Sequence, residues 1–406
     1  MNEFASDYAL LALRLARLLD KHHPGTWILD YRGPARWREQ VAAEPEPLAE
    51  EVVVAADALA AEAASWEGPR AAWMREQVGA LAAAARRLTG KTGALRERVR
   101  GGLGLEVGWI AEERFEEAYE LLDRGLPRSG GTLRERLVGW RAAHSIVPAR
   151  SPHFSAMVRA AITESIERTR ALVELPPQVR VDCELAPGPF RGLHRGGSRG
   201  TVLVDGDLPF NTADLLYVVT HEAFPGHIAE FMLKEALLSD HPELGVRFMP
   251  APSYVLSEGL GLHAQQIVFP RDEAQKWLVD NIEGFTHDGS DHADIHRARN
   301  ILWGSWCNAA LLADEGGSPS RVRAYLAEHA LLDDDELSVA PDFLGEYIFA
   351  YYHGWRLLEH RVQDPAFVRR LLTEQVSLGE VLQEEGDALS EARPGAVVPE
   401  QRERLL

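Results

Sequence analysis

The sequence predicts a mainly helical α+β fold with one small β-sheet. Apolar residues recur every three or four positions along most of the 406 residues, which is the spacing of amphipathic helices. Two short runs near the middle of the chain are instead rich in β-branched residues and are bounded by glycine or proline. We therefore expect a helical lobe over residues 1–178 and a second lobe over residues 179–406, within one continuous unit that contains a cleft.

Helices are predicted first over residues 9–19 and then over the stretches rich in Ala, Glu and Arg at 45–66, 69–88, 110–123, 131–144 and 151–174. No heptad pattern persists for three or four repeats, so packed antiparallel helices are expected and not a coiled coil.

After the pair Pro176-Pro177 the pattern changes, and short strands are predicted over residues 179–185 and 200–206. This small sheet precedes a helix from Ala213, which it could simply support, or it could bind a peptide backbone by strand addition. Beyond that point helices dominate again, with loops predicted over residues 240–252, 285–291, 314–319 and 333–341.

The most informative segment is His221-Glu-Ala-Phe-Pro-Gly-His227, which ends the apolar run 213–220. Two histidines with a glutamate directly after the first are typical of zinc sites in which the imidazoles hold the ion and the carboxylate is a general base. In a straight helix, residues six apart lie about 120° apart around the axis and could not share one ion. Because Pro225 and Gly226 interrupt the helix, we expect His227 to return to the face of His221. The alternative is an ordinary broken helix whose histidines act as polar caps.

A third ligand is expected from a later helix, as a carboxylate. Glu258 is the candidate, because it is a single acid within the apolar stretch 254–263 and a buried, unpaired carboxylate is costly. Otherwise Glu258 would be an acid near a helix N-terminus, stabilised by backbone N–H groups. Glu230 competes as a ligand, but we expect it to face elsewhere or to orient His227 from behind.

The segment 349–356 concentrates aromatic side chains and hydrogen-bond donors. In zinc peptidases a Tyr hydroxyl or a His can stabilise the negative charge that develops on the former carbonyl oxygen. Tyr351, Tyr352 and His353 are all eligible for that role, although aromatic residues at helical spacing also commonly fill a core.

His-Glu-x-x-Pro-Gly-His at 221–227, a Glu-Gly pair at 258–259 and Tyr-x-x-Gly at 351–354 resemble a bacterial domain family of unknown function. That family is similar in fold to the Taq-type zinc carboxypeptidases and, more remotely, to neurolysin-like peptidases. The resemblance covers roughly residues 105–360 and implies a helical metallopeptidase-like fold.

The resemblance implies that His221, His227 and Glu258 hold a zinc ion. It further implies that Glu222 is the general base and that Tyr351 stabilises the oxyanion, with His353 as the second candidate. The chain departs from the family at three positions that concern the pocket wall. Members often have His after the second ligand and Trp and Tyr after Glu-Gly, where this chain has Ile228, Leu260 and His263.

A rival metal candidate is the pair His292 and His296, which are four residues apart and could chelate on a regular helix. No glutamate follows His292, and aspartates surround the pair. A solvated helix start capped by Ser290 or Asp291 is therefore expected, with a role in lining the cleft as the alternative.

Composition and charge exclude several classes of partner. The formal net charge is −19, whereas nucleic acids and anionic membranes attract basic patches, so neither is expected as a partner. Cys183 and Cys307 are far apart in sequence, which argues against a disulfide framework and a thiolate metal site. The acidic first residues and the lack of a membrane-length apolar run predict a cytoplasmic protein, and a homo-oligomer is compatible with the sequence.

Together these patterns predict a zinc-dependent hydrolase with one Zn²⁺ per chain that acts on a peptide or a small amide, and the resemblance implies a peptidase of the carboxypeptidase or oligopeptidase type. Arg297 or Arg299 could bind a substrate carboxylate, although a surface ion pair is the more common fate of arginine. Two alternatives remain open. One is a non-catalytic helical binding protein, and the other is a carboxylate-rich iron or manganese site in a helical bundle, formed by Glu222, His227, Glu230 and Glu258.

Overall fold

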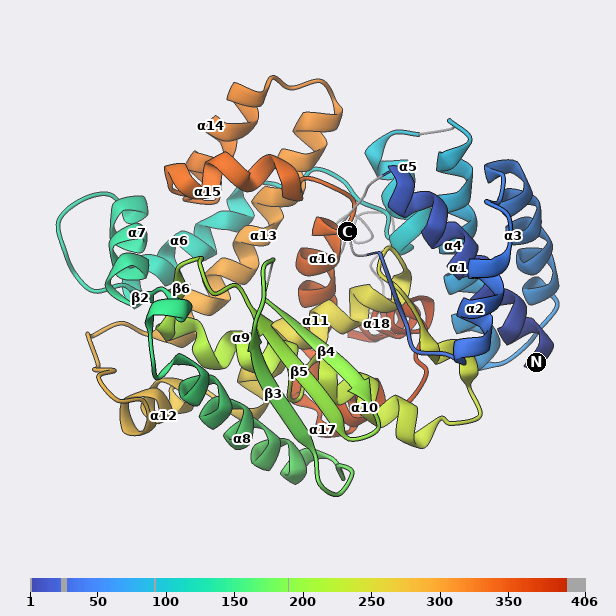
Figure 1. Cartoon of the computed structure of the whole chain (residues 1–406). Helices are drawn as coiled ribbons and strands as arrows, with labels where there is room; N and C mark the ends of the chain where they lie inside the picture. Colours follow the sequence, from blue (N-terminus) through green and yellow to red (C-terminus); the bar gives the residue numbers. More distant parts are fainter. Residues whose placement is uncertain (1, 23–27, 91–92, 189, 393–406) are drawn as a thin grey trace. The chain divides into compact units, whose positions relative to one another are not determined.

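The computed structural model describes residues 2–22, 28–90, 93–188 and 190–392. It is mainly helical, with sheets of two or three short strands, and so confirms the predicted fold class (Figure 1). Contacts divide the chain into two compact units, Met1–Gly108 with Lys234–Leu256 and Thr373–Leu406, and Trp109–Leu233 with Ser257–Leu372. Their boundaries differ from the break predicted after residue 178, because the first unit collects segments from three parts of the chain.

In the first unit, helices α1 and α3 pack against α4 around a core that includes Tyr8, Leu11 and Leu81. Its helices are α1 (Asn2–His22), α2 (Ala35–Ala43), α3 (Ala49–Ala64), α4 (Pro69–Leu88), α5 (Leu95–Leu103) and α18 (Leu378–Ala392). The prediction of a purely helical lobe over residues 1–178 is wrong at β1 (Leu29–Tyr31). This strand pairs with β7 (Val246–Phe248). The partner strand lies far along the chain, so no local pattern indicates this pairing.

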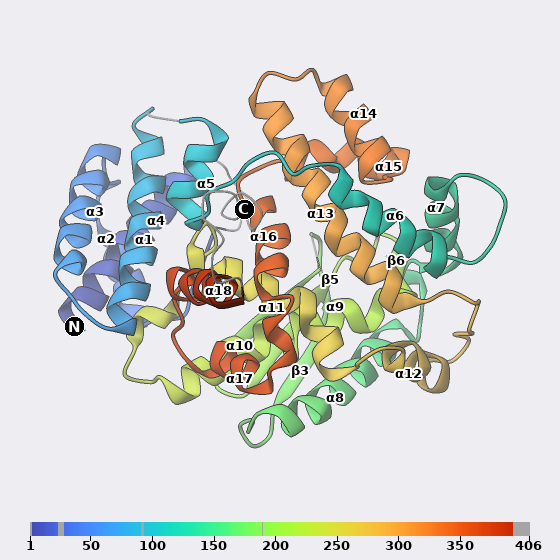
Figure 2. The same cartoon turned by 180° about the vertical axis from the view of Figure 1, so that it is seen from behind.

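The second unit is centred on α13 (His292–Asp314), which packs against α6 and α16 (Figure 2). The other helices within it are α6 (Glu113–Gly125), α7 (Leu133–Ala143), α8 (Phe154–Leu172), α9 (Leu215–Glu222), α12 (Glu273–Asn281), α14 (Pro319–His329), α15 (Asp334–Val339) and α16 (Ile348–Leu358). Helices α10 (His227–Leu237), α11 (Pro252–Val268) and α17 (Pro365–Thr373) each cross a boundary between the units.

The predicted small sheet is present in the second unit, in the order β3-β5-β4. Strands β3 (Arg180–Leu185) and β5 (Arg199–Val204) confirm the two predicted runs and are parallel to each other, and β4 (Arg191–Gly196) is antiparallel to β5. The sequence pattern missed β4, because its polar and glycine residues lack the β-branched character of the other two strands. Strands β2 (Ser145–Ile146) and β6 (Phe210–Asn211) form a further pair, which the sequence patterns did not predict.

Two predicted loops contain regular structure. The loop 240–252 holds a 3₁₀ turn, Pro242–Gly245, followed by β7. The loop 333–341 holds α15, whose start is a capping box: the Asp333 carboxylate accepts from the Glu336 N–H, and the Glu336 carboxylate accepts from the Asp333 N–H. These reciprocal bonds satisfy the first N–H groups of a short helix. Within the described ranges, no helix is both long and apolar enough to span a membrane.

Candidate metal site and its pocket

A break between two helices brings His221 and His227 together. Helix α9 ends at Glu222 and α10 begins at His227. At Gly226 the chain passes so close to the last turn of α9 that a Cβ atom would lie 1.7 Å from the His221 carbonyl oxygen, so only glycine fits there. The two imidazole rings are perpendicular, with centroids 4.8 Å apart, which is the return to one face expected from the sequence.

Glu258, from the middle of α11, completes the group. Its Oε2 lies 3.2 Å from Nε2 of His221, and its Oε1 lies 3.5 Å from Nε2 of His227. One ligand atom from each of the three residues lies within 4.8 Å of the others, and His227 and Glu258 are buried. In a tetrahedral zinc site with bonds of about 2.0–2.1 Å, neighbouring ligand atoms are about 3.3 Å apart. The two distances from Glu258 to the histidines are close to this value, so the arrangement suits a single ion.

The donor set also has the chemistry of a cation site. Oε2 of Glu258 is buried and, beyond its 3.2 Å contact with Nε2 of His221, forms no hydrogen bond with a described residue, so its negative charge is costly unless a cation meets it. Without an ion, burial opposes a charge on His227, but the Glu258 carboxylate outweighs burial and raises the pKa of His227 to about 9. A proton and a metal ion thus compete for the same imidazole nitrogen.

Ser257 fixes the orientation of the His227 ring. Its hydroxyl donates to Oε2 of Glu230 at 2.6 Å, so its oxygen is left to accept from Nδ1 of His227 at 3.0 Å. With its proton on Nδ1, a neutral His227 presents the Nε2 lone pair towards Glu258. Glu230 therefore acts on the Nδ1 side of the ring, which agrees with the orienting role expected from the sequence.

Tyr347 is a contact that sequence reasoning missed. Its hydroxyl donates to Oε1 of Glu258 at 2.5 Å, and its ring packs edge-on against Tyr351 with centroids 5.7 Å apart. Residues four apart on a helix share a face. The spacing from Tyr347 to the predicted Tyr351 is the signal that could have found it.

Glu222 lies beside the three candidate ligands and is hydrogen-bonded to the sheet. Its Oε2 accepts a 2.6 Å hydrogen bond from the backbone N–H of Gly192 in β4. Burial, opposed by the neighbouring histidines, raises the pKa of Glu222 above its ordinary value. A carboxylate that is held in place and is more basic than usual is suited to accept a proton.

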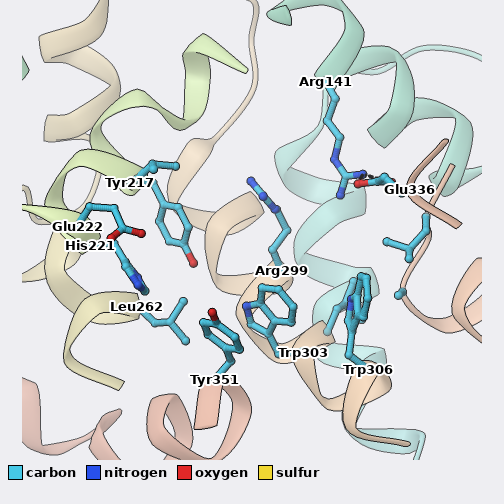
Figure 3. A pocket seen from close by; sticks show the side chains of 14 residues that line it. Arg141, Tyr217, His221, Glu222, Leu262, Arg299, Trp303, Trp306, Glu336 and Tyr351 are labelled. Carbon is cyan, nitrogen blue, oxygen red and sulfur yellow. Dashed lines mark hydrogen bonds and ion pairs between the residues drawn. The ribbon is translucent and has the colours of Figure 1, made fainter. Parts of the chain in front are cut away.

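A pocket of about 260 Å³ opens beside His221 and Glu222 (Figure 3). Its wall is aromatic and aliphatic, with two arginines and one further acid, and it comprises Arg141, Tyr217, Val218, Leu262, Arg299, Leu302, Trp303, Trp306, Ala330, Leu332, Glu336 and Tyr351. Figure 3 shows the hydroxyl ends of Tyr217 and Tyr351 directed towards the same space. Tyr217 stands four residues before His221 on α9, and its hydroxyl donates to Oδ1 of Asn300 at 2.5 Å.

Tyr351 and His353, the two candidate oxyanion donors, have different surroundings. Tyr351 lines the pocket and stacks on Trp303, with ring centroids 4.8 Å apart. His353 is 3% exposed, packs against Phe349 and Tyr352, and is not part of the pocket wall. Burial lowers the pKa of His353 to about 4, and its Nε2 has no partner among the described residues.

The rival histidines are buried and do not form a solvated helix start. His292 and His296 are 2% and 4% exposed, and neither lines the pocket. The expected cap is confirmed for Asp291, whose side chain accepts from the Asp294 N–H. His296 contacts Asp214 through Nε2 at 2.9 Å, and burial lowers the pKa of His292 to about 3.

Comparison with protein-family models and with curated proteins finds no match. Among solved structures, the chain is similar to one described as the putative lipoprotein from Colwellia psychrerythraea, with a TM-score of 0.49 and 14% identity. The match covers 88% of this chain and 66% of that protein, so the chain spans less than two thirds of the neighbour's length. At this degree of similarity nothing about the site or its chemistry follows from the neighbour.

Proposed function

We propose that this chain is a zinc-dependent hydrolase that cleaves a peptide or small amide bond. The observation that carries the proposal is the convergence of His221, His227 and Glu258, with Glu222 beside them at the edge of a pocket. Two imidazoles and one carboxylate are a known ligand set of catalytic zinc, which leaves a position open for water or substrate.

Zinc bound there would make water more acidic and would polarise the scissile carbonyl. The residues of the chain then handle the proton. Glu222 takes a proton from the attacking water as the new C–O bond forms, and returns it to the leaving nitrogen as the C–N bond breaks. The N–H of Gly192 holds one oxygen of Glu222, so the other oxygen is left to accept the proton.

Tyr351 would stabilise the negative charge that develops on the carbonyl oxygen. It lines the pocket, and no described residue accepts a hydrogen bond from its hydroxyl. Burial, with Glu258 and Glu222 nearby, raises the pKa of Tyr351 well above its ordinary value, so the hydroxyl keeps its proton for donation. Tyr217 faces the same space but already donates to Asn300.

Metal analysis and one isosteric variant test the proposal. Purified protein should carry one zinc per chain, and His221→Ala, His227→Ala and Glu258→Ala should each lose it. Glu222→Gln should keep the zinc and lose turnover by several orders of magnitude, because an amide cannot accept the proton. Full activity of Glu222→Gln in a peptide-library digestion would sink the hydrolase mechanism even with zinc present.

The iron or manganese alternative has less support from the geometry. It needs Glu230 among the ligands, whereas Glu230 accepts from Ser257 on the far side of the His227 ring. Two metal ions per chain would favour that alternative, and a metal-free protein that binds peptides without cleaving them would favour a binding role. The cytoplasmic location stays a prediction.

A further inference from the structure

We infer that the pocket recognises a carboxylate group of the substrate and that Arg299 binds it. This inference rests on the proposed function and adds the substrate class to it. Arg299 comes from α13 and lines the same pocket as His221 and Glu222. Figure 3 shows it between those two residues and Arg141.

Arg299 is held in place by an acid that is not part of the pocket wall. Asp214 is 8% exposed, and its Oδ1 accepts from Arg299 at 2.7 Å and contacts Nε2 of His296 at 2.9 Å. Gln265 contacts the other nitrogen of the His296 ring, and Tyr217 stacks on that ring. The counter-charge therefore fixes the guanidinium from behind and leaves the pocket side of Arg299 to a ligand.

The guanidinium retains hydrogen-bonding capacity. Arginine carries five N–H donors in a planar fork, which matches the two oxygens of a carboxylate. Asp214 uses Nη1, and no described residue accepts from Nε or Nη2 of Arg299. The side chain is 29% exposed, so these donors are accessible from the pocket.

Arg141 adds a second guanidinium to the same wall. Its Nη1 contacts both carboxylate oxygens of Glu336 at 2.7 Å. Although each arginine is paired with an acid, a carboxylate in the pocket would meet charge-assisted N–H donors in this wall.

The rest of the pocket suits an apolar side chain beside that carboxylate. Trp303 and Trp306 lie on the same helix as Arg299, and Leu262 lies near the metal ligands. A space of about 260 Å³ is at the small end for ligand pockets, so it accommodates a fragment of about one amino-acid residue. The carboxylate belongs either to the C-terminus of a peptide or to an acidic side chain, and the two sources are separable by experiment.

The test is a binding measurement in the zinc-loaded Glu222→Gln variant, which needs no turnover. The probes are acetyl-Gly-Phe with a free C-terminus, its C-terminal amide, and acetyl-Gly-Asp amide, titrated by calorimetry. The free acid should bind about tenfold or more tightly than its amide, because only the acid offers two charged oxygens to the guanidinium. Tighter binding of acetyl-Gly-Asp amide would keep Arg299 as the partner and place the carboxylate on a side chain.

Arg299→Met should abolish the preference for carboxylate probes, and Arg299→Lys, which keeps the charge beside Asp214, should reduce it. Arg297→Met is the matched control, because Arg297 lies on the same helix but pairs with Glu117 and Glu359 and does not line the pocket. It should leave the preference unchanged. Equal binding of all three probes, or a preference that survives in Arg299→Met, would overturn the inference.

Hydrolysis separates this inference from the proposed function. If the wild-type protein cleaves peptides but treats acid and amide alike, the carboxylate site is wrong and the hydrolase stands. If the acid is preferred in binding through Arg299 but no peptide or amide is cleaved, the carboxylate site stands and the hydrolase is wrong.

Discussion

Three consecutive side chains of α16 have different surroundings although all are aromatic. Tyr351 lines the pocket. Tyr352 is 6% exposed, and its ring lies against Gly304 of α13. His353 is buried in the core. Residues one position apart on a helix point about 100° apart, so only one of the three can face a given site. The helix orientation thereby selects Tyr351 as the candidate donor.

Tyr351→Phe removes that hydroxyl and little else. If the hydroxyl meets the developing oxyanion, kcat should fall about 10²-fold or more, with zinc content unchanged and KM nearly unchanged. Tyr352→Phe is the control and should have a much smaller effect. Steady-state kinetics on any cleaved peptide would check this, and equal small effects in both variants would mean that the segment serves only packing.

Ser257 would act on a bound metal ion through His227. In Ser257→Ala the Nδ1 proton of His227 and the Glu230 carboxylate both lose their hydrogen bond to the Ser257 hydroxyl, so the ring would be less firmly held with Nε2 towards Glu258. Zinc affinity should fall about 10- to 100-fold, as measured by competition with a chelating dye. Ser305→Ala is the control, since Ser305 is equally buried but only bonds the Leu302 carbonyl within α13. Unchanged zinc affinity in Ser257→Ala would show that the hydrogen bonds of Ser257 do not position His227.

The contact between strand β4 and helix α9 controls the placement of Glu222. A Cβ atom on Gly192 would lie 2.0 Å from the backbone carbonyl oxygen of Glu222. The obstacle is backbone, which cannot swing aside as a flexible side chain can. The strand and the helix can therefore approach this closely only because residue 192 is glycine.

Gly192→Ala should force β4 away from the end of α9 and lengthen the Gly192–Glu222 hydrogen bond. We expect a loss of about 1–3 kcal/mol in the free energy of unfolding, as for an overpacked core, together with a marked loss of turnover. Gly139→Ala, within α7, is the control: nothing lies within 4 Å of its Cβ position, so alanine should be neutral or stabilising there. Urea unfolding of both variants would test this, and equal stabilities would mean that the two elements separate without cost.

Buried neutral histidines should make the free energy of unfolding of the whole molecule depend on pH. Burial lowers the pKa of His263 and of His353 to about 4, and that of His292 to about 3. Below a pH of about 6.5 the unfolded chain binds protons at these residues, whereas the folded chain does not bind them until about pH 4. The unfolded state is therefore favoured increasingly as the pH falls through this window.

For His353 alone, the pKa difference corresponds to about 2 kcal/mol of stability lost between pH 7.5 and pH 5. His353→Phe removes the titrating group and keeps an aromatic ring at the position. The free energy of unfolding of this variant should fall by about 2 kcal/mol less than that of the wild-type protein over the same interval. Identical pH dependence in the two proteins, measured by urea unfolding, would show that folding does not lower the pKa of His353.

The amino-acid sequence alone was enough to predict the helical class, the strands β3 and β5, and the three residues of the candidate metal site. These features depend on local patterns: apolar periodicity, β-branched runs, and a glutamate directly after a histidine ahead of Pro-Gly. The sequence also indicated Glu258, because a single acid in an apolar helix needs a partner. The zinc ion and the hydrolytic activity stay predictions from that pattern.

Which side chains meet depends on the three-dimensional packing of the chain. Tyr347 reaches Glu258, Ser257 joins His227 to Glu230, and Asp214 holds Arg299, each across a separation in sequence that local patterns do not encode. The same holds for β1 with β7 and for the small strand β4. Such contacts depend on the packing of whole helices and strands against one another, where burial and steric fit override the preferences of the individual segments.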